Sequence, residues 1–181
     1  MNKENNIILG ILFMTLAMFC LSVNDVLVKG LSSAYPIWEV IFFRAFSGVI
    51  VSIILICFFG WQTLKTTKPV GHLTRAFSSV ACVVFYFYGL KYLMLSENVA
   101  IVHSAPIIAT LLAAPILGEK LGLHRITAVI IGFIGVLVIV KPGSDLFKIE
   151  SLFPLGAAFF MATTYLATRF LMSTESSVAI I

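Results

Sequence analysis

The run IILGILFMTLAMFCLSV, residues 7–23, decides the class of fold, because it is almost wholly apolar and contains no charge. A helix that crosses a bilayer needs about 20 mostly apolar residues. Similar runs recur along the chain, and the sequence predicts an all-α, polytopic membrane helix bundle of about six transmembrane helices. The expected spans are residues 7–29, 37–59, 73–90, 97–117, 123–140 and 152–172.

The overall composition supports this class. Hydrophobic residues make up 60% of the 181 residues and charged residues 11%, and the mean hydropathy is +1.09. Soluble domains average roughly 45–50% apolar and about 25% charged residues. The net charge of +4 comes from basic residues scattered between apolar blocks, so it does not indicate a nucleic-acid surface. We therefore expect the lipid bilayer as a partner and no nucleic acid.

Short breaks separate the spans. Pro36 stands where the second helix can begin. Gly118 and Gly122 bracket a tight hairpin, with glycine at a helix end. Residues 60–71 are too polar to cross hydrocarbon, and KP at 141–142 stops the fifth span.

Basic residues near the span ends predict the orientation. With the N-terminus in the cytoplasm, seven of them flank the spans on the cytoplasmic side and four on the other side. This bias favours a cytoplasmic N-terminus. The first set is Lys3, Lys65, Lys68, Arg75, Lys120, Arg125 and Arg169, and the second is Lys29, Lys91, Lys141 and Lys148.

Polar residues inside the spans are the best indicators of function, since a charge at a helix centre costs about 2.5–3.5 kcal/mol on insertion scales. In the first span Ser22, Asp25 and Lys29 share one face, and their order favours an Asp25–Lys29 ion pair. By the helical rise, Arg44 and His103 each lie roughly 10 Å below the outer surface, and Asp25 is shallower. A shared water-filled cavity is the expected explanation, with Arg44 lining it or pairing with Asp25.

The third span adds one more polar candidate. Tyr86 continues a polar and small-residue stripe, whereas its aromatic neighbours occupy every face and are expected in packing or lipid contact. The candidate substrate-binding residues are therefore Asp25, Arg44, Tyr86 and His103. Structural alternatives stay open at this point. Asp25, Lys29 and Arg44 could snorkel to the interface, and His103 could hold a structural hydrogen bond.

The sequence offers little for catalysis. No Gly-x-x-x-x-Gly-Lys-Ser/Thr loop is present to hold ATP phosphates. His103 and Ser104 are adjacent on a helix and diverge by about 100°, which is poor geometry for a base and its nucleophile. Cysteines 20, 57 and 82 lie inside apolar blocks without the spacing of a metal site. We expect no enzyme, no catalytic residue, no cofactor and no metal.

The ordered set of motifs resembles EamA-type carriers of the drug/metabolite transporter superfamily. NDVLVK at 24–29 and EVIFFR at 39–44 resemble the opening of that family. The resemblance continues, in family order and spacing, through AP at 105–106, GEKL at 118–121, GFIGV at 132–136 and KP at 141–142.

With TLKTTKP at 63–69, the first two motifs look most like S-adenosylmethionine uptake carriers of obligate intracellular bacteria. The resemblance implies a secondary, non-ATP transporter in the bacterial inner membrane. It would move a small polar metabolite such as S-adenosylmethionine or an amino acid. Arg44 would hold a carboxylate, Asp25 would offset an amine or cation, and Tyr86 would stack on a ring or sulfonium.

The family has ten spans in two inverted five-helix repeats around one cavity. On that pattern we expect a five-helix repeat at 1–142, a loop at 143–151, a sixth transmembrane helix at 152–172 that starts a second repeat, and a tail at 173–181. The chain is then expected to be a truncated carrier or its N-terminal half. It would need a second half or a second copy and would not transport alone. A non-transporting membrane subunit or pseudogene product is the alternative. Without the other helices of the second repeat, the small residues of the sixth helix, such as Gly156, are expected to lack a packing partner.

Overall fold

The computed structural model describes residues 3–60, 66, 68–118, 122–140 and 148–172. Six stretches in these residues are long and apolar enough to cross a membrane, which confirms the predicted helical membrane bundle. The helices are α1 (Lys3–Ala34), α2 (Ile37–Phe59), α3 (Pro69–Tyr92), α4 (Leu95–Val102), α5 (Ala105–Leu117), α6 (Leu123–Val140) and α7 (Leu152–Met172), and a 3₁₀ turn, η2 (Ile149–Ser151), precedes α7.

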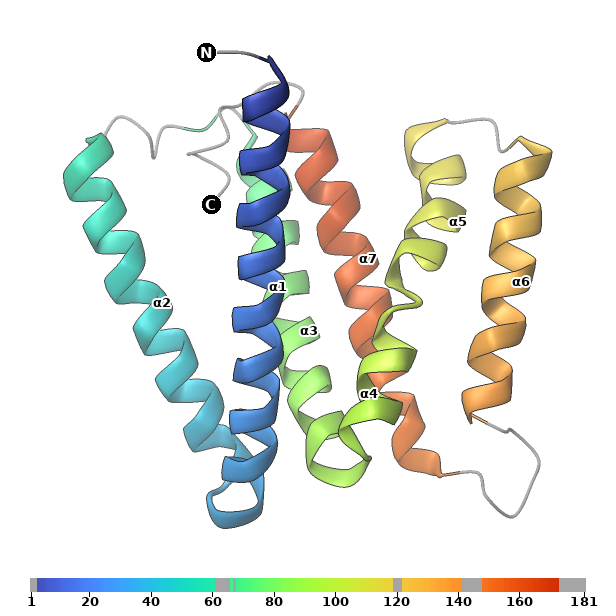
Figure 1. Ribbon diagram of the computed structural model, residues 1–181, viewed down its shortest axis with the longest axis horizontal. Helices are drawn as coiled ribbons and strands as arrows, with labels where there is room; N and C mark the ends of the chain where they lie inside the picture. Colours follow the sequence, from blue (N-terminus) through green and yellow to red (C-terminus); the bar gives the residue numbers. More distant parts are fainter. Residues whose placement is uncertain (1–2, 61–65, 67, 119–121, 141–147, 173–181) are drawn as a thin grey trace.

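The spans run up and down in sequence order (Figure 1). Because α4 and α5 together make one span, the start of α1 and the end of α7 lie on the same side of the bundle. The α1–α2 turn, the α3–α4 turn and η2 lie on the opposite side. We call these the N-terminal side and the hairpin side.

The fourth span differs from the single helix expected at 97–117. It is interrupted at His103 and Ser104, which separate α4 from α5. Pro106 has no N–H, so the carbonyl of Val102 cannot receive its α-helical hydrogen bond. The N–H of Ser104 donates to Ile101 O at 3.0 Å, a tighter turn than an α-helix makes. The break is therefore built into the backbone.

The predicted helix boundaries at Pro36 and Gly118 are confirmed. Pro36 precedes α2, and Gly118 ends α5 in the left-handed conformation with φ 68°, which glycine adopts without strain. The KP stop at 141–142, residues 61–65, 67 and 119–121, part of the expected loop (143–147) and the expected tail (173–181) lie outside the described residues.

The most buried helix is α7, which packs against α3 on one side and against α4 and α5 on the other. Ala157, Ala158 and Ala162 are completely buried. A Cβ atom on Gly156 would lie 2.6 Å from the ring of Phe85. The expectation that the small residues of this helix lack a mate is therefore wrong, because they let α3 approach closely.

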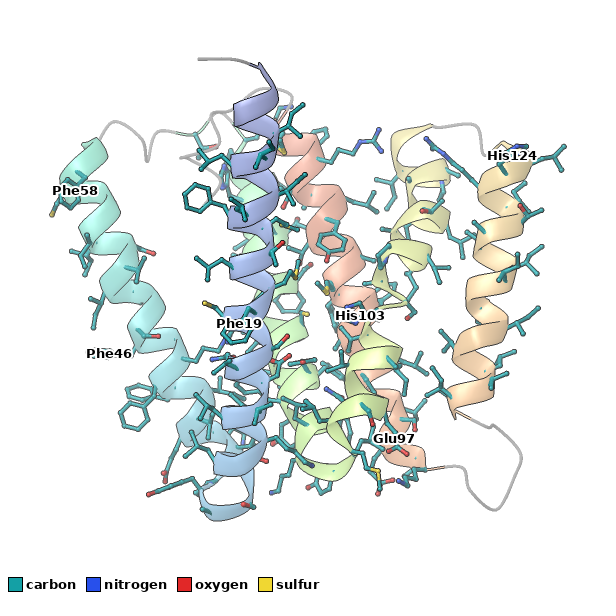
Figure 2. All side chains as sticks on the ribbon, in the orientation of Figure 1. Phe19, Phe46, Phe58, Glu97, His103 and His124 are labelled. Atoms are coloured by element: carbon teal, nitrogen blue, oxygen red, sulfur yellow. The ribbon has the colours of Figure 1, made fainter. Side chains whose placement is uncertain are left out.

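The outer helices are exposed to their surroundings. Every residue of α1 from 7 to 23 is exposed. Phe19 on α1 and Phe46 and Phe58 on α2 are 65%, 55% and 82% exposed, and the two on α2 point away from the bundle (Figure 2). In a membrane protein such apolar side chains contact lipid, so the polar groups near these helices require a separate explanation.

Candidate functional site

Asp25 and Tyr86 meet inside the membrane-spanning part of the bundle. The hydroxyl of Tyr86 on α3 donates to Oδ2 of Asp25 on α1 at 2.7 Å, and both side chains are half-buried. A short O–H···O⁻ contact of this kind is a charge-assisted hydrogen bond. It fixes the carboxylate while leaving its other lone pairs available.

Arg44 on α2 joins the same region from a third helix. Its Nη1 donates to Oδ1 of Asn24 at 3.1 Å. Its guanidinium carbon lies 5.5 Å from the ring centroid of Phe87, within the range of a cation–π interaction. The guanidinium is thus positioned by α1 and α3 and remains exposed. The predicted pairing of Arg44 with Asp25 is replaced by a bond to the neighbouring residue, Asn24.

Lys29 does not form the ion pair with Asp25 that the i, i+4 spacing favours. Its ammonium group donates to the carbonyl oxygens of Leu90, at 2.5 Å, and Leu93, at 2.7 Å. These carbonyls belong to the C-terminal end of α3, where helical carbonyls lack N–H partners and the helix dipole attracts cations. Lys29 therefore has a structural role, one helical turn nearer the hairpin side than Asp25.

A groove of about 980 Å³ runs between α1 and α2. The two helices meet at their connecting turn and diverge toward the N-terminal side (Figure 1). Asn24 and Arg44 line the groove near its middle. The complete lining is Asn24, Leu27, Val28, Leu31, Tyr35, Glu39, Val40, Phe43, Arg44, Ser47, Gly48, Val51 and Ser52.

Most of the charged and hydroxyl groups of the groove come from α2, and we call that side its polar wall, although apolar residues such as Val40 and Phe43 lie between them. Glu39, Arg44, Ser47 and Ser52 supply carboxylate, guanidinium and hydroxyl groups along α2. Leu27, Val28 and Leu31 are among the apolar residues opposite, on α1. Such a surface can accommodate a ligand with both an ionic end and an apolar part.

His103 lies away from these contacts, at the break between α4 and α5 (Figure 2). Its Nδ1 lies 2.7 Å from the carbonyl oxygen of Val99, one turn earlier. A carbonyl only accepts, so Nδ1 carries a proton and donates it to this oxygen. Among the described residues no hydrogen bond joins His103 to Asp25, Arg44 or Tyr86. The structure thus pairs Asp25 with Tyr86, places Arg44 in the adjacent groove through its bond to Asn24, and places His103 on another span. Of the four candidates, only Arg44 lines the groove.

Sequence reasoning did not include Asn24, Glu39, Ser47 or Ser52, which all line the groove, among the candidates. The signal for Asn24 was present, because a second polar residue stood beside Asp25 in a span. Ser47 lies three residues after Arg44 and therefore on the same helix face, although its hydroxyl also donates to Arg44 O at 2.8 Å.

This arrangement defines a multi-pass membrane protein with ionisable and hydroxyl groups gathered along an open groove within its spans. The EamA-like transporter family matches residues 8–141. The chain belongs to the EamA-like transporter family, whose members are transporters.

Three curated relatives illustrate the range of this family. The S-adenosylmethionine uptake transporter of Rickettsia bellii is 29% identical over 173 residues, which cover 96% of this chain and 60% of that protein. The riboflavin transporter of Vibrio cholerae is 35% identical over 116 residues, 64% of this chain and 39% of the relative. The pseudopaline exporter of Pseudomonas aeruginosa is 29% identical over 161 residues, which cover 88% of this chain and 56% of the exporter.

The chain thus spans about 60% of the length of the S-adenosylmethionine uptake transporters that it matches. No solved structure matches it.

Proposed function

We propose that this chain is part of a secondary transporter of the bacterial inner membrane and that the α1–α2 groove binds its substrate, a small polar metabolite. The observation that carries the proposal is the position of Arg44. Its charge lies in a membrane span, exposed in a groove, and held by Asn24 and Phe87 rather than by a carboxylate. A charge there is costly unless it faces water or a charged ligand.

The chemistry of the site suits a zwitterionic substrate. The guanidinium of Arg44 would bind a carboxylate, for which its planar fork is well matched. Asp25 does not line the groove but follows Asn24, which does, and its carboxylate, oriented by Tyr86, would attract an ammonium or sulfonium group from beside the groove. S-adenosylmethionine has all three of these charged groups, and transporters of this compound are among the relatives. Riboflavin, the substrate named for another relative, has none of them.

Completion of the site requires a cover for the open groove. The groove lies between helices whose outer faces are apolar and exposed, so without a cover its polar wall would face lipid. We propose that a second half of the transporter or a second copy of this chain closes it, because alternating access needs two units that move around one site. With no ATP-binding loop in this sequence, the driving force would be an ion gradient or exchange.

Direct binding to the purified chain tests the substrate site without requiring transport. Binding of labelled S-adenosylmethionine would be measured in detergent for the wild-type chain and for Arg44→Gln, with methionine and riboflavin as competitors. We expect saturable binding that methionine reduces and riboflavin does not. Loss of a charge-assisted contact of about 1.5–3 kcal/mol predicts roughly 10- to 150-fold weaker binding in the variant.

Two further variants make the result specific. Arg75→Gln removes the same charge from α3 on the N-terminal side, where Arg75 donates to Thr168, and should leave binding unchanged. Tyr86→Phe should weaken binding less than Arg44→Gln, since it frees Asp25 without removing its charge. Equal affinity of the wild-type chain and Arg44→Gln would refute the assignment of the groove.

A further inference from the structure

A second cavity lies between α5, α6 and α7, away from the α1–α2 groove. Its volume is about 380 Å³. Two arginines line it, Arg125 from the start of α6 and Arg169 from the last turn of α7. The remaining lining residues are Ala109, Thr110, Ala113, Tyr165 and Leu166.

Both arginines lie near the ends of their membrane spans. Arg125 is the third residue of α6, and Arg169 is three residues from the end of α7. At 1.5 Å per residue, each is within about 5 Å of its helix end. Both ends lie on the N-terminal side of the bundle (Figure 1), and His124 marks the start of α6 in Figure 2. The arginine end of the cavity therefore lies toward the depth of lipid headgroups, and Ala109 and Tyr165 line its inner part, further from the helix ends.

Further basic residues surround the same end of α7. Nε of Arg75 donates to Oγ1 of Thr168 at 3.2 Å, and the ammonium of Lys68 lies 4.1 Å from the ring centroid of Phe170. Cations from α3, α6 and α7 and from the residue before α3 thus converge on one end of the bundle. Their summed field attracts anions to this surface.

The cavity combines this charge with an apolar wall. The small side chains of Ala109 and Ala113 leave the cavity open, and Leu166 contributes an aliphatic side chain to its wall. Guanidinium groups bind phosphate through paired hydrogen bonds. A phosphate on an apolar molecule fits such a wall better than a free phosphate ion does. Basic pockets between transmembrane helices on the cytoplasmic side are suited to anionic lipid headgroups.

We propose that the cavity between α5, α6 and α7 binds the phosphate-bearing headgroup of an anionic membrane phospholipid. The guanidinium groups of Arg125 and Arg169 contact the phosphate, and the acyl chains follow the exposed apolar surface of α5 and α6. This site is independent of the α1–α2 groove. It stabilises the contact between α6, the outermost helix of this half of the bundle, and α7.

Lipid retention by the purified chain tests the proposal. Native mass spectrometry would count phosphatidylglycerol bound to the wild-type chain and to the double variant Arg125→Gln/Arg169→Gln, and thermal unfolding would measure the accompanying stabilisation. At about 1 kcal/mol for each basic residue, the double variant should bind about 30-fold more weakly. Phosphatidylcholine, which has a phosphate but no net charge, should stabilise neither protein.

Controls distinguish the source of the phosphate and the effect of misfolding. Lys91→Gln/Lys148→Gln removes two charges from the hairpin side and should bind phosphatidylglycerol as the wild type does. Ala113→Leu keeps both arginines, fills the cavity and should also lose the lipid, which tests the site if the double variant fails to fold. Equal retention by the wild type and Ala113→Leu would overturn the proposal. Equal stabilisation by inorganic phosphate and by phosphatidylglycerol would also overturn it, in favour of a free-anion site.

Discussion

Lys29 and Asp25 show how charged residues on one helix acquire different roles one turn apart. Lys29 extends to the end of α3 and binds two carbonyl oxygens, whereas Asp25 contacts the hydroxyl of Tyr86. The spacing in the sequence predicted that the two would pair with each other. It could not show that α3 ends beside Lys29, because that contact joins residues about sixty positions apart.

Lys29→Met tests the structural role at this scale. The substitution keeps most of the aliphatic stem and removes the ammonium, leaving the carbonyls of Leu90 and Leu93 without their donor. Hydrogen bonds to charged groups contribute about 1.5–3 kcal/mol, and we expect a loss of that size in the free energy of unfolding in lipid–detergent micelles. Lys91→Met is the control, because Lys91 is exposed on the same helix end and, among the described residues, its ammonium lies against the face of Tyr92. A similar effect of both substitutions would show that Lys29 does not hold α3.

Asp25 and Tyr86 are in contact, and Arg44 bonds to the residue next to Asp25, although only Arg44 lines the α1–α2 groove. Intramembrane charge is costly, so charged residues at similar depth tend to share a polar space. His103 also met this criterion but bonds to its own helix. Depth along a span can be estimated from sequence, whereas the direction in which a helix faces depends on its packing.

At the scale of the helices, hydropathy and length were enough to place six spans. They did not reveal the break between α4 and α5, because apolar residues continue through it and hydropathy is insensitive to backbone hydrogen bonding. Hydropathy and length also led to a wrong expectation for α7. The sequence indicates no packing partner for its small residues, but in the fold these residues lie against α3.

Close packing of α3 against α4 and α7 depends on Gly89. A Cβ atom at this position would lie 1.9 Å from Oδ1 of Asn98, whose side chain is completely buried, and 3.2 Å from Cδ of Pro154. Gly89→Ala should therefore force the helices apart and lower the free energy of unfolding by about 1–3 kcal/mol, the usual cost of overpacking. Gly30→Ala is the control, since no atom lies within 4 Å of a Cβ there. Unfolding midpoints in detergent measure both, and an unchanged midpoint for Gly89→Ala would show that the helices are not so closely packed.

At the scale of the whole molecule, the orientation in the membrane remains a prediction from the basic residues. Thr66 lies three residues before α3, which starts on the N-terminal side, and Lys148 immediately precedes η2 on the hairpin side; both are exposed. In a background without the native cysteines, a membrane-impermeant thiol reagent added to intact cells should label Lys148→Cys. It should label Thr66→Cys only after the membrane is permeabilised. Labelling of Thr66→Cys in intact cells would reverse the topology and would place the proposed lipid site in the outer leaflet.

The central claim is that the polar wall of the α1–α2 groove faces water and a ligand, although it lies among membrane-spanning helices. Cysteine protection tests it most directly, with Ser47→Cys in the groove and Ile53→Cys on an exposed position of α2 outside the groove lining. A thiolate forms only in contact with water, so a water-soluble thiol reagent should modify Ser47→Cys and leave Ile53→Cys unmodified. S-adenosylmethionine should slow the reaction at Ser47→Cys in a concentration-dependent way, and Arg44→Gln should abolish that protection. Equal reaction at the two positions, with no protection by the ligand, would contradict the claim.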